Sequence, residues 1–144
     1  MATLSAIPIK PPYIDMILAG FKTWEIRSKF TKKIGPVALI RSGPGTVVAT
    51  AILSEVIKLT ADFAYKNKNN LGIKSMPREH ASSYEGKHAW ILKDIIKLKT
   101  PVPYNHPSGA VTWVTLDEAT TRKVIAEAKN SPKVKPMPNI SYHP

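Results

Sequence analysis

The 144-residue sequence contains no cysteine. This absence excludes disulfide bonds, thiolate nucleophiles, iron-sulfur clusters and zinc sites that depend on cysteine ligands. Long apolar runs are also missing, because no stretch approaches the roughly 20 residues that a membrane-spanning helix requires. The first residues lack the basic start, apolar run and cleavage site of a secretory signal. We therefore expect a soluble, cytoplasmic protein with no membrane partner.

Acidic residues are scarce relative to basic ones. The sequence has ten Asp and Glu residues and 21 Lys and Arg residues, which gives a formal net charge of +11. A charge of this size attracts polyanions over long distances and favours binding through counterion release. Nucleic acid is therefore the expected partner class. The alternative is that the charge serves only solubility.

Several motifs of well-known chemistry are also absent. The four histidines, His80, His88, His106 and His143, have no spacing that gathers three metal ligands. There is no Gly-x-Ser-x-Gly turn, no phosphate-cradling glycine loop and no dinucleotide fingerprint. We therefore expect neither a metal nor a cofactor, and we exclude serine acyl transfer and nucleoside triphosphate hydrolysis.

Hydrophobic periodicity and turn residues predict more strands than helices. The strands lack regular alternation with helices, which favours an α+β fold with a mixed or antiparallel sheet curled into a small barrel. Strands are predicted over 4–9, 21–28, 37–41, 46–59, 87–98 and 110–116, and helices over 12–19, 77–83 and 117–129. Residues 60–76 are predicted to form a polar helical stretch interrupted by a loop at 66–70. Gly20 is expected to end the first helix, and Thr60 and Asp117 are expected to cap the helices that follow them. Glu79 and His80 are expected on a solvated helix face.

The chain length fits one domain. We place this domain at residues 1–130, followed by a proline-rich tail at 131–144 without a core of its own. Residues 101–109 hold three prolines and a glycine, which predicts a connection. Glu55 interrupts the apolar face of the 46–59 strand and indicates a bulge, a bend or a functional side chain.

The densest polar cluster is Gly20-x-Lys22-x-x-Glu25-x-Arg27, at the junction of a predicted helix and strand. Lys22 becomes a nucleophile only if burial or nearby cations lower its pKa, which is about 10.4 when unperturbed. A nearby Glu25 carboxylate instead favours the ammonium, which would polarise a carbonyl or hold a phosphate. Arg27 has the planar fork that suits a cytosine carbonyl or a phosphate.

Structural interpretations of the same residues stand beside the functional ones. Lys22, Glu25 and Arg27 also fit a salt-bridge group at a barrel rim. Trp24 and Tyr84 are candidates for stacking on a base, whereas tryptophans more often belong to the core.

The sequence Leu18-Ala19-Gly20-Phe21-Lys22-Thr23-Trp24-Glu25-Ile26-Arg27 resembles the signature of the ASCH domain family. Further agreement comes from Pro8 to Pro11, Ile40-Arg41-Ser42-Gly43, His88 to Leu92, and Pro101-x-Pro103-Tyr104 leading to Trp113-Val114. The resemblance spans Ile7 to Leu116. It implies a PUA-like β-barrel with flanking helices and a cleft in which the motif faces a ligand.

The resemblance also implies an association with RNA. Some small bacterial members hydrolyse N(4)-acetylcytidine and related N(4)-acylated cytidines, using the motif lysine, a threonine three residues later and a separate glutamate. Other members are ribonucleases, RNA-binding modules or coactivator modules. The lysine corresponds to Lys22, and Glu25 occupies the threonine position. Glu79 and Glu85 are the candidates for the separate glutamate.

The leading hypothesis is a metal-independent hydrolase of N(4)-acylcytidine amides, acting on RNA or a modified nucleoside. The alternatives are a non-catalytic RNA-binding module, a metal-independent ribonuclease and a protein-interaction adaptor. The candidate residues are Lys22, Glu25 and Glu79 for catalysis, Arg27, Trp24, Arg41, Ser42 and Tyr84 for ligand binding, and Lys29, Lys32 and Lys33 for nucleic-acid binding.

Overall fold

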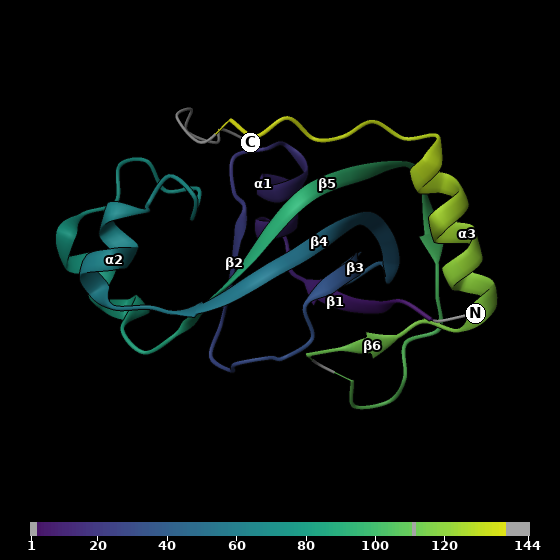
Figure 1. The fold of residues 1–144 in the computed structure, drawn as a ribbon, viewed down its shortest axis with the longest axis horizontal. Helices are drawn as coiled ribbons and strands as arrows, with labels where there is room; N and C mark the ends of the chain where they lie inside the picture. Colours follow the sequence, from purple (N-terminus) through teal and green to yellow (C-terminus); the bar gives the residue numbers. More distant parts are fainter. Residues whose placement is uncertain (1–2, 111, 138–144) are drawn as a thin grey trace.

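The fold is centred on one six-stranded sheet, seen in a computed structural model that describes residues 3–110 and 112–137. The strands are β1 (Ser5–Ile9), β2 (Trp24–Arg27), β3 (Gly35–Arg41), β4 (Thr46–Lys58), β5 (His88–Pro103) and β6 (Val114–Thr115). Their order is β2-β5-β4-β3-β1-β6 (Figure 1). β1 pairs with β3 in parallel, and all other pairs are antiparallel. The sheet is therefore mixed, as predicted.

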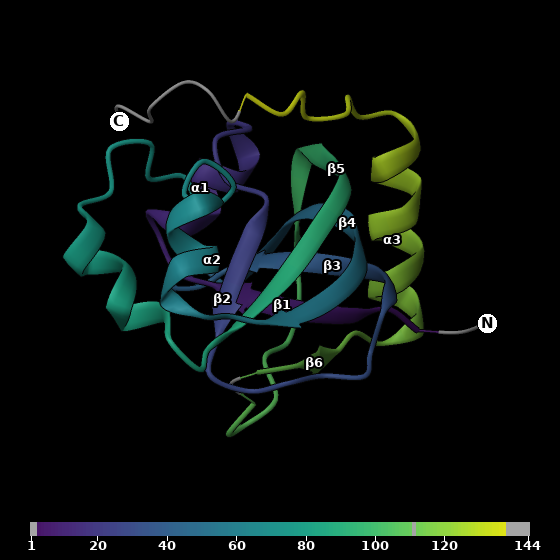
Figure 2. The ribbon, with the colours of Figure 1, turned by 60° about the vertical axis from the view of Figure 1, so that its left-hand side comes forward.

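Short helices flank this sheet. They are α1 (Tyr13–Leu18), α2 (Ala61–Lys66), the 3₁₀-helix η1 (Arg78–Tyr84) and α3 (Glu118–Lys129). Figure 2 shows the sheet curling into a half-barrel, with α2 and α3 at opposite ends. The predicted α+β, PUA-like architecture is confirmed. Within the described residues, no helix combines the length and the apolar character needed to cross a bilayer.

Three buried clusters hold the helices on the sheet. The largest fills the inside of the curl and includes Ile14 and Ile17 of α1, which share one face as the helical spacing predicts. A second cluster packs Val124 of α3 against the sheet. The third packs Ala64 of α2 and Ala81 of η1 against β2 and β5. Apolar burial of this kind fixes the segment between β4 and β5 in place.

The two longest strands, β4 and β5, bend where their register shifts. One shift lies between Leu53 and Glu55, and the Glu55 side chain is exposed. Ser54 is the extra residue, because Leu53 pairs with Leu92 and Glu55 pairs with Ile91. The bulge shifts the alternation of side chains, which explains why an acidic residue interrupts the apolar face expected from the sequence. The predicted irregularity at Glu55 is confirmed.

The prediction of a connection starting at residue 101 is wrong, because β5 continues to Pro103. Val102 is buried and pairs with Val47 of β4. β2 pairs with β5 only at 88–91, so beyond that point β5 is an edge strand on one side. An edge position tolerates proline because no partner needs the missing N–H.

The helix ends agree with the sequence, whereas some lengths do not. Thr60 accepts a hydrogen bond from the Phe63 N–H, and Asp117 accepts one from the Thr120 N–H. Both are N-caps, as predicted. The predicted loop at 66–70 is confirmed by turns from residue 67, but the helical stretch does not resume before 76. Among the described residues of the predicted 110–116 strand, only the two residues of β6 are in a strand.

The segment after α3 runs back across the molecule, over β5 and α1 (Figure 1). Lys133 forms a bridge with Ile96 of β5, and Val134 packs against the main core. The Met137 N–H donates to the Gly20 carbonyl at 2.7 Å. We call residues 131–137 the C-terminal strap. The remainder of the predicted tail, 138–144, lies outside the described residues.

Candidate functional site

The motif begins at Gly20, directly after α1. Its φ of +90° is the left-handed conformation that commonly ends a helix. A Cβ at this position would also overlap the backbone carbonyl of Lys135 in the strap. The Phe21 N–H then donates to the Met16 carbonyl at 2.9 Å and closes the helix end. Glycine is therefore required both by the backbone angle and by the strap.

Residues 70–72 support the other side of Lys22. The N–H groups of Thr23 and Trp24 both donate to the Asn70 carbonyl, at 3.0 and 3.1 Å. Gly72 has a φ of +80°, and a Cβ on it would lie 3.2 Å from the Lys22 Cβ. Close backbone approach of this kind needs glycine. The lysine backbone is thus held from two directions.

Lys22, Glu25 and Arg27 line one pocket of about 900 Å³. Its walls come from the end of β1, from α1 and β2, from the turn after β3, from residues 71–87 and from the loop at 104–110. The lining residues are Pro8, Lys10, Tyr13, Met16, Lys22, Glu25, Ile26, Arg27, Ser42, Gly43, Gly45, Leu71, Ile73, His80, Ser83, Tyr84, Lys87, Tyr104, His106 and Ala110.

Lys22 is the most unusual charged group in the pocket. Its side chain is only 4% exposed. Burial lowers the Lys22 pKa from 10.5 to about 8, and the nearby Glu25 carboxylate limits that fall. The ammonium also lies 5.8 Å from the centre of the Tyr13 ring. A lysine with such a pKa is partly neutral near physiological pH and can accept a proton.

Glu25 and Arg27 form an ion pair at the pocket wall. The Arg27 Nε donates to Glu25 Oε2 at 3.0 Å, and Arg27 Nη2 donates to the Pro8 carbonyl at 2.5 Å. The guanidinium also lies over the Trp90 ring, 5.6 Å from its centre. Arg27 therefore has a fixed position and compensates the charge of the Glu25 carboxylate.

Two tyrosines complete the wall around the lysine. Burial raises the Tyr84 pKa above 10, and Tyr13 raises it further. The Tyr84 hydroxyl therefore stays protonated at neutral pH and can donate a hydrogen bond. Ser42 lines the same pocket from the turn after β3. The pocket thus combines a proton acceptor, fixed donors and aromatic surface, which suits a planar polar ligand.

A match to a family model identifies the family to which this chain belongs. The sequence model of the ASCH domain matches residues 7–102, which is two thirds of the chain. The chain belongs to the ASCH domain family. The resemblance predicted from the sequence is therefore confirmed, and with it the family's general association with RNA. A search of curated proteins finds no match.

Solved ASCH structures share the fold of this ASCH domain. The ASCH protein from Zymomonas mobilis is 16% identical with a TM-score of 0.58, covering 91% of this chain and 97% of its own. A tyrosine-to-phenylalanine variant of it is 17% identical with a TM-score of 0.59, covering 85% and 96%. A serine-to-alanine variant is 16% identical with a TM-score of 0.59, covering 89% and 96%. At such low identity the likeness concerns the fold alone.

Three of the residues predicted for catalysis or ligand binding lie outside the pocket lining of this ASCH domain. Trp24 is buried and stacks on Phe63, with ring centres 5.9 Å apart. Arg41 forms an ion pair with Asp15 of α1. Glu79 is exposed on η1, because the turn of that helix directs other residues to the pocket. The structure thus gives Trp24 and Arg41 structural contacts and does not bring Glu79 to Lys22.

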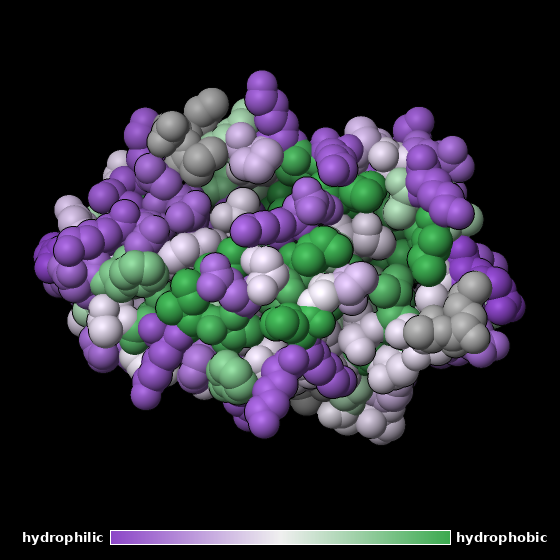
Figure 3. Space-filling model, viewed as in Figure 1, coloured by the Kyte–Doolittle hydropathy of each residue, from purple (hydrophilic) through white to green (hydrophobic). Residues whose placement is uncertain are grey.

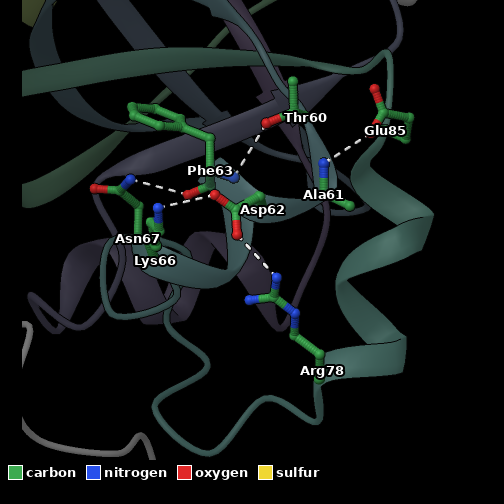
Figure 4. Close-up of polar contacts among 8 residues, drawn as sticks. All are labelled: Thr60, Ala61, Asp62, Phe63, Lys66, Asn67, Arg78 and Glu85. Atoms are coloured by element: carbon green, nitrogen blue, oxygen red, sulfur yellow. Dashed lines mark hydrogen bonds and ion pairs between the residues drawn. The ribbon is translucent and has the colours of Figure 1, made fainter.

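Glu85, the other candidate for the separate glutamate, supports α2. Its Oε1 accepts a hydrogen bond from the Ala61 N–H at 2.9 Å, at the start of α2 (Figure 4). Arg78 of η1 pairs with Asp62 of α2 in the same view. Glu85 is not among the pocket residues. The ASCH pocket therefore has Glu25 as its carboxylate among the residues that the structure describes.

The three lysines predicted to bind nucleic acid lie on the exposed loop between β2 and β3. Lys29, Lys32 and Lys33 are all exposed and outside the pocket lining. The loop is anchored because the Trp90 indole N–H donates to the Lys29 carbonyl at 3.0 Å. Lys33 lies over the Trp113 ring, 5.0 Å from its centre. The exposed lysine side chains therefore extend from a loop whose backbone is held in place.

Sequence reasoning missed several pocket residues. Lys10, Tyr13, His80, Lys87, Tyr104 and His106 all line the pocket, although His80 was expected on a solvated helix face. For residues 80 to 87 a signal existed, because the lining positions 80, 83, 84 and 87 follow helical spacing. The others come from three separate segments, and only the tertiary fold brings them together. Within 3–110 and 112–137, no group of three His, Asp or Glu could hold a metal ion.

The 104–110 loop holds a hydrogen-bond chain at the pocket edge. His106 Nε2 lies 2.7 Å from the Ala110 carbonyl, which can only accept, so Nε2 carries the proton. His106 Nδ1 then accepts from the Tyr104 hydroxyl in the neutral ring, also at 2.7 Å. This chain fixes the orientation of both rings against the pocket.

Proposed function

We propose that this ASCH protein hydrolyses the amide bond of N(4)-acylated cytidines in the Lys22 pocket, without a metal. The observation that supports the proposal is Lys22 itself, which is 4% exposed and has a pKa lowered to about 8. Burying a lysine lowers the stability of the fold. Titratable residues in pockets whose pKa is strongly shifted belong to functional sites more often than chance predicts. A pocket of about 900 Å³ has room for a nucleoside.

In the proposed reaction, neutral Lys22 accepts a proton from a water molecule as that water attacks the acyl carbon. A tetrahedral oxyanion forms, and the protonated Tyr84 hydroxyl and the Arg27 guanidinium are the nearby donors that can stabilise it. The bond between the carbon and N4 then breaks, and N4 takes the proton from the Lys22 ammonium. The products are cytidine and a carboxylic acid, and Glu25 holds Arg27 in place.

The test is cytidine release from N(4)-acetylcytidine in the presence of EDTA, followed by chromatography. We expect turnover by the unmodified protein and none by Lys22→Met. Lys58→Met is the matched control, because Lys58 is an exposed lysine outside the pocket. No turnover, or turnover that survives Lys22→Met, would reject the proposal.

A second candidate function is RNA binding without chemistry, favoured by the loop between β2 and β3. Phe30 and Ile34 are 58% and 64% exposed, and they lie in the same loop as Lys29, Lys32 and Lys33. Exposed aromatic and basic residues on an anchored loop suit the bases and phosphates of a single strand. On the face shown in Figure 3, apolar side chains gather near the centre, with hydrophilic side chains among them and along much of the edge.

The two functions make different predictions for labelled single-stranded RNA. Binding without chemistry predicts salt-dependent affinity, intact RNA and about tenfold weaker binding by Phe30→Ala. Ile125→Ala is the control, since Ile125 is an exposed apolar residue on α3. Shortened RNA would instead indicate the ribonuclease alternative, and affinity insensitive to salt would reject electrostatic RNA binding.

A further inference from the structure

The face of η1 that lines the pocket, together with Lys87 after it, carries an imidazole, a phenol and an ammonium. His80, Ser83, Tyr84 and the following Lys87 all line the pocket, while Glu79 does not. The His80 ring meets the Tyr84 ring edge-on, with centres 5.8 Å apart. One wall of the pocket therefore presents an aromatic ring beside an imidazole and an ammonium.

The hydrogen bonds of this wall limit which groups can bind a ligand. The Ser83 hydroxyl donates to the His80 carbonyl at 2.8 Å, so its proton is already used. The Lys87 backbone N–H donates to the Tyr84 carbonyl at 3.0 Å, which fixes the lysine's position at the end of η1. The donors left for a ligand on this wall are the Tyr84 hydroxyl, the His80 ring and the Lys87 ammonium.

The charges of the pocket do not balance. Four cationic side chains, Lys10, Lys22, Arg27 and Lys87, line it with one carboxylate, Glu25. That carboxylate is paired with Arg27 at 3.0 Å. Among the described residues, no carboxylate forms an ion pair with Lys10 or Lys87. The pocket therefore has a surplus of positive charge that an anionic ligand would neutralise.

The surplus lies at the open side of the pocket. Lys10 and Lys87 are exposed, whereas Lys22 and Glu25 are buried. A ligand whose base reaches Lys22 would leave its sugar and any phosphate near the solvent, where Lys10 and Lys87 lie. Ammonium groups bind phosphate well as point charges, even when partly hydrated.

We propose that Lys10 and Lys87, the exposed lysines of the pocket lining, form a phosphate subsite, so that the ligand of the pocket is a cytidine nucleotide rather than a free nucleoside. This inference rests on the proposed function for the placement of the base. The phosphate can belong to a mononucleotide or to a nucleotide within an RNA strand, and both present the same anion to the two lysines.

The test compares the affinity of the protein for cytidine, for cytidine 5′-monophosphate and for a cytidine-containing RNA trinucleotide by calorimetry. We expect the monophosphate to bind about tenfold more tightly than cytidine. The Lys10→Ala/Lys87→Ala double variant should remove this preference and leave cytidine binding within twofold. Lys58→Ala/Lys99→Ala is the control, because both are exposed lysines outside the pocket.

The outcomes separate the subsite from the chemistry. Equal affinity for cytidine and its monophosphate, or a preference that survives in the double variant, overturns the subsite even when N(4)-acetylcytidine is hydrolysed. A preference for the monophosphate that the double variant loses supports the subsite even when no amide is hydrolysed. Tighter binding of the trinucleotide than of the monophosphate assigns the phosphate to an RNA strand, and the reverse assigns it to a free nucleotide.

Discussion

At the scale of single residues, Lys22 combines burial with a titration near physiological pH, and this predicts how activity depends on pH. Only the neutral amine can accept a proton from water, and its share rises as pH passes the pKa of about 8. The kcat/KM for N(4)-acetylcytidine should therefore rise about tenfold between pH 7 and pH 9 and then level off. Initial rates corrected for uncatalysed hydrolysis measure this. A flat profile over that range would exclude Lys22 as the base.

The same burial predicts that Lys22 destabilises the fold. Below pH 8 the lysine is charged in the folded and in the unfolded protein, so the folded protein bears the full free-energy cost of burying the charge. Between pH 8 and 10.5 the folded protein loses this proton first, and its stability rises. Lys22→Met should therefore raise the free energy of unfolding at pH 7 by up to about 3 kcal/mol. Urea unfolding at pH 7 and pH 10.5 measures the difference in the free energy of unfolding between the unmodified protein and Lys22→Met. This difference should nearly vanish at the higher pH. A difference that is the same at both pH values would contradict the lowered pKa of Lys22.

Gly72 offers a test of how Lys22 is positioned. A Cβ there would overlap the end of Met16 and lie 3.2 Å from the Lys22 Cβ, in a backbone conformation with φ of +80°. Gly72→Ala should lower stability by about 1–2 kcal/mol and reduce kcat more than KM changes. Gly86→Ala is a matched control, because it has the same φ and nothing within 4 Å. If both variants lose activity equally, contact with Lys22 is not the cause.

At the scale of helices and strands, the sequence predicted those features that depend on neighbouring residues in the chain. The Gly20 helix end, the Thr60 and Asp117 caps and the Glu55 bulge were all predicted and confirmed, because each follows from neighbouring residues. The continuation of β5 through Pro101 was missed, because it depends on Val102 meeting a distant strand. The pattern of neighbouring residues does not predict which distant strand will pair with this segment.

The contact between α2 and the segment after η1 shows the same limit, and Glu85 provides the test. Sequence alone left Glu79 and Glu85 as candidates for the separate glutamate and placed Glu79 among the catalytic residues, whereas in the structure the Glu85 carboxylate accepts a hydrogen bond from the Ala61 N–H (Figure 4). Glu85→Gln retains an acceptor oxygen, so it should keep activity, and Glu85→Ala should lose about 0.5 kcal/mol of stability. Hydrolysis rates and urea unfolding measure both. Loss of activity in Glu85→Gln with an intact fold would return Glu85 to a catalytic role.

At the scale of the whole molecule, the pocket draws on segments from Pro8 to Ala110, and no sequence pattern could assemble them. The motif at 20–27 was found because its residues are adjacent in the chain. Lys10, Lys87 and the Tyr104 loop reach the pocket only through the strand order of the sheet. Trp24 was a candidate for ligand binding with a core position as the alternative, and its own strand did not show that Phe63 of α2 would stack on it.

The C-terminal strap extends this dependence to the far end of the chain. Val134 packs on the core, the Val134 N–H donates to the Ile95 carbonyl at 2.7 Å, and Met137 binds Gly20 next to Lys22. A chain ending at residue 130 loses these contacts, whereas one ending at 137 keeps them. The shorter chain should be less stable by about 2 kcal/mol and should hydrolyse N(4)-acetylcytidine more slowly, because the Gly20 turn loses its support.

Comparing these two chains isolates the strap, because both lack residues 138–144. Urea unfolding gives the stability difference, and rates at a temperature where both chains are folded give the effect on the site. Equal stability and equal rates would show that the domain is complete at residue 130, as the sequence predicted. A slower rate with both chains fully folded would instead mean that the strap positions Lys22 through Gly20. The functional unit would then extend to residue 137.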